Sequence, residues 1–133
     1  MRVLVAEDEP TYCALVEAIL TASGYEVVVA RDGQEAWEVL NSGDAPPLAV
    51  IDWMMPRMDG IELCRRVKGS SLRHIYVILL TGRNQEEDAV TGREAGADDF
   101  FPKPLDPTKL IARVDAGRNA VEAGRCTPGT DSK

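Results

Sequence analysis

The most informative part of this sequence is the stretch of residues 48–60, LAVIDWMMPRMDG. It opens with an apolar run that predicts a short strand buried on both faces, as in a parallel sheet covered by helices. Asp52 follows where that strand should end, and Pro56 cannot continue a strand ladder. Asp59 and Gly60 can then turn the chain and cap a helix. Asp52 should therefore stand exposed at the carboxyl edge of a sheet, where chemistry collects in open α/β folds.

A carboxylate at such an edge can also be only a solvated loop residue, so the interpretation of Asp52 depends on the rest of the chain. Apolar runs predict strands at residues 3–6, 25–30, 48–51, 76–80 and 99–101. Helix-start signals follow each run, at Pro10, Asp32, Asp59, Asn84 and Asp106. Strands that alternate with helices in this way predict an α/β fold, a doubly wound parallel sheet with right-handed crossovers.

Helical spacing of apolar residues predicts which side of each helix packs on the sheet. In the first helix the predicted inner face consists of Ala14, Leu15, Ala18, Ile19 and Ala22. The fourth helix has a shorter apolar face, made of Ala89, Val90 and Ala95. Gly92 makes that helix about 1 kcal/mol less favourable than alanine would. We therefore expect the fourth helix to be the least firmly docked element.

The last helix carries a weak heptad-like stripe at Leu110, Val114, Gly117 and Val121. Leu110 and Val114 should pack on the sheet. Past Gly117 the sheet should have run out, so Val121 is the better candidate for contact with a second subunit or a downstream helix.

The 133 residues suffice for one domain, which we place at residues 1–122. Residues 123–133 are polar and rich in helix breakers, and we expect a disordered tail or the start of a linker. A formal net charge of −7 argues against nonspecific binding to nucleic acid or anionic membranes. The sequence shows no apolar run of roughly 18 to 20 residues and no signal peptide, so a cytoplasmic location is expected.

Other conspicuous side chains have structural interpretations. Cys13, Cys64 and Cys126 have only His74 as a possible metal-binding partner and should be reduced structural thiols. We interpret the densest basic cluster as a solvated surface with His74 in a surface loop; the cluster consists of Arg65, Arg66, Lys68, Arg73 and His74. Trp37 should belong partly to the core, and Trp53 should lie near Asp52.

Polar side chains follow four of the predicted strands and should meet at one sheet edge: Glu7, Asp8, Asp52, Thr81 and Lys103. Two carboxylates about 4 Å apart repel by roughly 4 kcal/mol at an effective dielectric constant near 20, so three of them need a cation. An all-oxygen ligand set suits Mg²⁺. Lys103 could pair with an incoming phosphoryl oxygen, and Thr81 offers a hydroxyl donor. This combination fits phosphoryl transfer to a carboxylate nucleophile.

The segments VLVAEDEP, VIDWMMPRMDG, LLTG and AGADDFFPKPL occur in this order along the chain. Together they resemble the receiver domain of the bacterial two-component response-regulator family, over about residues 2–122. The resemblance implies a five-stranded sheet of flavodoxin-like order 2-1-3-4-5 with five helices. It also implies a signalling switch that a sensor histidine kinase or a phosphotransfer protein phosphorylates. The switch would control a downstream effector through its fourth helix, fifth strand and fifth helix, with homodimer formation as one route. It would catalyse only its own phosphorylation and slow dephosphorylation.

The resemblance also implies individual roles. Asp52 would accept the phosphoryl group, and Thr81 and Lys103 would bind it. Mg²⁺ would be held by Glu7, Asp8, Asp52 and the backbone carbonyl of Met54. Thr81 and Phe100 would form the switch.

Two residues depart from the family pattern. Glu7 stands where aspartate is usual. Its extra methylene group can shift the metal ion, or a water molecule can lie between the Glu7 carboxylate and the ion. Phe100 replaces the usual tyrosine, so any switching must work through packing rather than a hydroxyl hydrogen bond.

Three other functions compete with this one. A phosphohydrolase of the haloacid-dehalogenase type needs a second aspartate two residues after the nucleophile, where this chain has Met54. A flavodoxin-type module has a hydroxyl-rich phosphate loop after its first strand, whereas the acidic residues 7–9 would repel phosphate. The remaining alternative is a receiver-like protein-interaction module that works without phosphorylation. The joint presence of Asp52, Thr81 and Lys103 argues against it.

Overall fold

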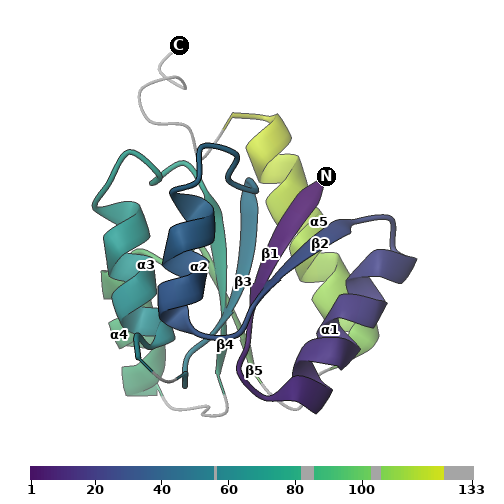
Figure 1. Cartoon of the computed structure of the whole chain (residues 1–133), viewed down its shortest axis with the longest axis horizontal. Coiled ribbons are helices and arrows are strands. Elements are labelled where there is room, and N and C mark those ends of the chain that lie inside the picture. Colours follow the sequence, from purple (N-terminus) through teal and green to yellow (C-terminus); the bar gives the residue numbers. More distant parts are fainter. Residues whose placement is uncertain (56, 82–85, 103–105, 125–133) are drawn as a thin grey trace.

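The computed structural model describes residues 1–55, 57–81, 86–102 and 106–124, with the backbone alone at 86–89 and 102. Within these residues five strands alternate with five helices (Figure 1). The strands are β1 (Arg2–Ala6), β2 (Glu26–Ala30), β3 (Leu48–Asp52), β4 (Tyr76–Thr81) and β5 (Asp99–Pro102). The helices are α1 (Pro10–Ala22), α2 (Gly33–Leu40), α3 (Gly60–Lys68), α4 (Glu86–Ala95) and α5 (Pro107–Glu122).

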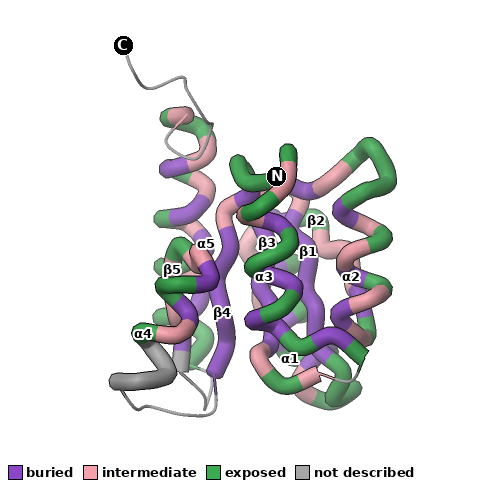
Figure 2. Tube along the Cα trace, turned by 90° about the vertical axis from the view of Figure 1, so that its left-hand side faces the viewer, coloured by how far each residue is buried: buried purple, intermediate pink, exposed green. Residues whose placement is uncertain are grey.

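The strands form one parallel sheet in the order β2-β1-β3-β4-β5, as predicted. Helices α1 and α5 cover one face of the sheet, and α2, α3 and α4 cover the other (Figure 1). Residues of β1 and β3 point alternately into the two resulting cores, so both strands are almost wholly buried (Figure 2). This explains why their sequences are continuous apolar runs.

Aspartates start three of the helices. Asp32, Asp59 and Asp106 each accept a hydrogen bond from the backbone N–H three residues later, which satisfies a donor that the first turn leaves free. Pro10 and Pro107 occupy first helical positions, where no backbone N–H is needed. The predicted helix starts at Pro10, Asp32, Asp59 and Asp106 are therefore confirmed, whereas Asn84 lies outside the described residues.

The predicted inner face of α1 is wrong except at Ile19, which packs partly against the core. Cys13, Val16 and Leu20 are buried, whereas Leu15 is 45% exposed and the alanines of the predicted stripe face outward. Two apolar stripes overlap in this helix, one residue apart. The structure buries the stripe that contains Val16 and Leu20, because these side chains remove more apolar area from water than alanine does.

Two further predictions about helix faces need correction. Val90 of α4 is 48% exposed, although Ala95 is buried as predicted, and the side chain of Ala89 lies outside the described residues. The end of α5 still packs on the domain, because Ala120 is buried and Val121 packs partly against the chain's own core. Val121 is therefore not a free contact residue. Among the described residues, no helix is both long enough and apolar enough to cross a membrane.

Candidate functional site

Three carboxylates converge at the carboxyl edge of the sheet. Oxygen atoms of Glu7, Asp8 and Asp52 all lie within 4.8 Å of one another. Glu7 and Asp52 are only 1% and 4% exposed, whereas Asp8 is open to solvent. The prediction that Asp52 is exposed is therefore wrong, although its place at the end of β3 is as predicted.

The strand register brings two of these acids together. Ala6 pairs with Ile51 across β1 and β3, so the residues that follow them, Glu7 and Asp52, lie side by side. The backbone N–H of Glu7 donates to the Ala30 carbonyl of β2 at 3.0 Å, which extends the sheet by one residue. Its Oε2 atom accepts a hydrogen bond from the Glu9 backbone N–H at 3.2 Å.

The donor set fits a hard divalent cation. Buried carboxylates at these separations repel one another strongly unless positive charge is near. Oxygen ligands together with an open, solvent-facing side at Asp8 suit Mg²⁺, which keeps several of its waters. The residues present therefore fit the metal that the sequence predicts.

The loop after β3 is packed tightly against the backbone that carries Asp52. The Gly60 backbone N–H donates to the Trp53 carbonyl at 2.8 Å. A Cβ atom at Gly60 would lie 2.5 Å from the Asp52 carbonyl oxygen and 2.9 Å from Trp53 Cα. Glycine is therefore required here by a close backbone approach. Met54, whose carbonyl is a predicted metal ligand, has a side chain that is 63% exposed.

The amino end of α2 supports the same loop. Asp32 caps α2 with one carboxylate oxygen and pairs through the other with Arg57 Nε at 3.4 Å. Arg57 has a φ of 71°, which is unusual for a residue with a side chain. Gly33 lies so close to the Met58 backbone that a side chain would overlap it. The sequence predicted that Asp32 caps α2, but it did not predict that Asp32 also holds the loop after β3 through Arg57. The opposite charges of these two residues were the one available signal.

The remaining predicted site residues lie on β4 and β5. Thr81 ends β4, is 6% exposed, and stands one residue past the partner of Asp52 in the sheet. Phe100 on β5 is half-buried and packs against the core on the α4 side. Lys103 lies outside the described residues.

The thiols have the structural role that the sequence predicts. Cys13 and Cys64 are buried and free, and burial raises the pKa of both, to about 11 for Cys64. Cys64 Sγ donates to the Ala95 carbonyl of α4 at 3.5 Å. Cys126 lies outside the described residues.

The basic cluster is only partly a solvated surface. Lys68 Nζ donates to Asp98 Oδ2 at 2.7 Å and to the carbonyls of Ile75 and Arg73 at 2.6 and 3.1 Å. Asp98 Oδ2 also accepts the Val77 backbone N–H at 2.8 Å. Lys68 therefore joins the end of α3 to the turn before β5, and its prediction as a solvated residue is wrong.

Trp37 and Trp53 both pack partly on the core, as predicted for Trp37. The guanidinium of Arg66 lies 5.9 Å from the ring centroid of Trp37.

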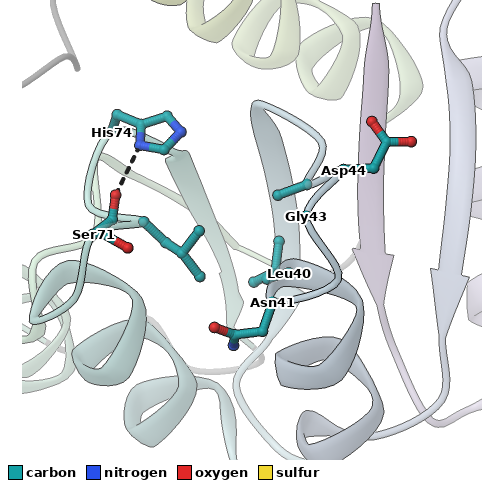
Figure 3. Close-up of a pocket in the computed structure, with 8 residues that line it drawn as sticks. Leu40, Asn41, Gly43, Asp44, Ser71 and His74 are labelled. Atoms are coloured by element: carbon teal, nitrogen blue, oxygen red, sulfur yellow. Dashed lines mark hydrogen bonds between the residues drawn. The ribbon is translucent and has the colours of Figure 1, made fainter.

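A hollow of about 450 Å³ lies at the opposite edge of the sheet (Figure 3). It is lined by the last residue of α2 and the loops before β3 and β4: Leu40, Asn41, Gly43, Asp44, Ala45, Ser71, Leu72 and His74. His74 is an exposed loop residue, as predicted, and its Nδ1 atom lies 3.2 Å from the Ser71 carbonyl oxygen. The hollow is thus separate from the acidic cluster.

Comparison with known proteins defines the class. The model of the response regulator receiver domain matches residues 3–115, and the chain belongs to this family. It is 41% identical over 116 residues to the phosphate regulon transcriptional regulatory protein PhoB of Escherichia coli, covering 86% of this chain and 50% of that protein. It is 39% identical over 115 residues to the alkaline phosphatase synthesis transcriptional regulatory protein PhoP of Bacillus subtilis, covering 86% of this chain and 47% of that protein. The chain therefore spans about half the length of the curated relatives it matches.

Solved structures agree in fold. A Francisella response regulator receiver domain superposes with a TM-score of 0.84 at 32% identity, covering 89% of this chain and 96% of that one. The receiver domain of a Syntrophus aciditrophicus signal transduction histidine kinase has a TM-score of 0.82 at 38% identity, covering 99% and 96%. The predicted fold and the predicted receiver-domain family are both confirmed.

Proposed function

We propose that this receiver domain is a switch that accepts a phosphoryl group on Asp52 from a sensor histidine kinase or a phosphotransfer protein. The convergence of Glu7, Asp8 and Asp52 at one sheet edge is the observation that supports the proposal most. Asp52 is the acid at the end of the central buried strand, and Thr81 stands at the end of the next strand.

The reaction transfers a phosphoryl group from a positioned donor to the acceptor carboxylate, and we expect it to require Mg²⁺. A carboxylate oxygen of Asp52 forms a bond to phosphorus while the bond from phosphorus to the phosphohistidine nitrogen breaks. The electron pair stays on that nitrogen, and with the other ring nitrogen protonated the leaving group is neutral imidazole. Water later hydrolyses the aspartyl phosphate to carboxylate and inorganic phosphate. Positioning and charge stabilisation carry this reaction, and we expect no other small-molecule turnover.

Glu7, Asp8, Asp52 and the backbone carbonyl of Met54 would hold Mg²⁺. When bound, the ion would neutralise charge on the carboxylates and on the phosphoryl oxygens. Glu7 is longer than the aspartate usual at its position, and its Oε2 atom accepts a hydrogen bond from the Glu9 backbone N–H.

Switching would pass from the phosphoryl group to one face of the domain. Thr81 would bind a phosphoryl oxygen, Lys103 would pair with the group, and Phe100 would repack in response. The face formed by α4, β5 and α5 would then act on an effector, in the same protein or a separate one, with homodimer formation as one route. Residues 1–122 would form the switch, and residues 123–133 would be a disordered tail or the start of a linker.

The test is phosphorylation in vitro. With Mg²⁺ and a small acyl phosphate, intact mass should rise by one phosphoryl group, and the Asp52→Asn variant should remain unlabelled. Asp44→Asn is the matched control, because Asp44 is exposed at the opposite edge of the sheet. Full labelling of Asp52→Asn would reject the acceptor. No labelling of the unmodified chain would favour an interaction module that works without phosphorylation.

A further inference from the structure

We infer that Gly92 is a positioning residue of the switch, because its missing side chain lets the ring of Phe100 pack directly on the α4 backbone. The ring then sets how closely α4 approaches the sheet. The inference rests on the proposed function, since it concerns how phosphorylation of Asp52 reaches α4. From the sequence alone, Gly92 counted only as an unfavourable helix residue.

A side chain at residue 92 has no room in this structure. A Cβ atom built on Gly92 overlaps Cζ and Cε1 of Phe100 and would lie 3.3 Å from Leu79 Cδ1. Gly92 is buried, and Phe100 packs half-buried against the core cluster that contains Leu79 and Ala95. The aromatic ring therefore fills the space that a side chain of α4 would otherwise occupy.

The carboxyl end of α4 is firmly held, and the contact with Phe100 lies just before it. The turn after α4 is fixed at Asp98, whose backbone N–H donates to the Val77 carbonyl at 2.9 Å and whose carboxylate accepts from Lys68 Nζ at 2.7 Å. Val90, earlier in the helix, is 48% exposed and adds little packing. The helix can therefore swing about its fixed end when the ring moves.

The sheet register connects this ring to the phosphorylation site. Phe100 pairs with Leu79, two residues before Thr81 on β4. Because Phe100 has no hydroxyl group, it can respond only through packing. A phosphoryl group that draws Thr81 toward Asp52 opens space into which the ring can move, away from Gly92. The contact with Gly92 thus belongs to the state without a phosphoryl group, and its loss releases α4.

The first test is a double-mutant cycle measured by urea unfolding. Helix propensity alone predicts that Gly92→Ala raises the unfolding midpoint, whereas overlap with the ring predicts a lower midpoint. Phe100→Ala removes the ring, so Gly92→Ala should no longer cause overlap when the two changes are combined. The equilibrium constant for unfolding of the double variant should therefore be at least about tenfold smaller than the value expected if the two single effects were independent. Glu94→Ala, at an exposed position of α4, is the control and should show no coupling to Phe100→Ala. A raised midpoint for Gly92→Ala or an additive cycle overturns the inference.

If the Gly92→Ala variant does not fold, the double variant with Phe100→Ala tests the inference instead. Recovery of a folded domain when Phe100→Ala is added supports the contact, and failure to recover overturns it.

The second test measures the switch itself, with beryllium fluoride and Mg²⁺ as the phosphoryl mimic. Gly92→Ala disfavours the state without a phosphoryl group, so it should bind the mimic at least about fivefold more tightly than the unmodified chain. Glu94→Ala should bind it as the unmodified chain does. Equal or weaker binding by Gly92→Ala overturns the inference. If the unmodified chain does not bind the mimic, or if Asp52→Asn binds it equally well, the proposed function fails instead, and the unfolding cycle still tests the contact.

Discussion

Removing one charge from the acidic cluster should make the metal-free domain more stable. Glu7 and Asp52 are both buried, and their oxygens lie within 4.8 Å. At an effective dielectric constant of about 20, unit charges at that separation repel by about 3.5 kcal/mol. The hydrogen bond that Glu7 accepts from the Glu9 backbone N–H offsets part of this repulsion. We therefore expect Asp52→Asn, which keeps the shape of the side chain, to raise the free energy of unfolding by about 1–2 kcal/mol without metal.

With Mg²⁺ bound, the unmodified chain should instead be more stable than the Asp52→Asn variant. The unmodified chain should gain about 2.7 kcal/mol at a Mg²⁺ concentration one hundred times its dissociation constant, and Asp52→Asn should gain much less. Urea unfolding followed by far-ultraviolet circular dichroism, with EDTA and with Mg²⁺, measures both effects. Asp44→Asn removes an exposed charge at the far edge and should change neither. A variant Asp52→Asn that is less stable than the unmodified chain in EDTA would refute the reasoning.

Three further predictions use other parts of the structure. Mg²⁺ should change the fluorescence of Trp53, which adjoins Asp52; Trp53→Phe should remove most of the response, and a response carried by Trp37 would place the site elsewhere. Arg57→Gly should raise the urea midpoint, because relief of the positive φ, about 1 kcal/mol, outweighs a long ion pair whose arginine is 69% exposed; a lower midpoint would show that the pair matters more. The raised pKa of Cys64, about 11 against an ordinary thiol value of 9.0, leaves stability unaffected below pH 9. Between pH 9 and 11 the thiol of the unfolded chain loses its proton before that of the folded chain. The free energy of unfolding should therefore fall with pH more steeply than in the Cys64→Ala variant, by up to about 1.4 kcal/mol per pH unit; parallel curves of unfolding free energy against pH for the two proteins would contradict this.

The features that the sequence predicted correctly are local. Asp32 and Asp59 cap helices because each side chain needs only a backbone N–H three residues ahead. The position of Asp52 follows from the apolar run before it and the turn after it. Strands that alternate with helices can form only a few sheet topologies. This explains why the observed strand order is the one that the resemblance to receiver domains implied.

The features that the sequence missed depend on neighbours distant in the chain. Asp52 is buried rather than exposed because Glu7 arrives beside it from another strand. The inner face of α1 was misplaced because two apolar stripes overlap, and only the shape of the sheet decides between them. Gly92 looked unfavourable until Phe100 was placed against it. None of these follows from periodicity, which carries no information about which distant residue fills a space.

The three hydrogen bonds of Lys68 have an evolutionary consequence. Its ammonium group has three N–H donors, and all of them are used, on Asp98 and on the carbonyls of Arg73 and Ile75. Gly96, with a φ of 101°, leaves room for the lysine stem, since a Cβ atom there would lie 2.7 Å from Lys68 Cγ. The planar guanidinium of arginine cannot reproduce this arrangement of donors. Across homologous receiver domains, residues 68 and 98 should therefore covary, and loss of the lysine should accompany replacement of the aspartate. Gly96 should persist in either case, because its φ of 101° favours glycine by itself.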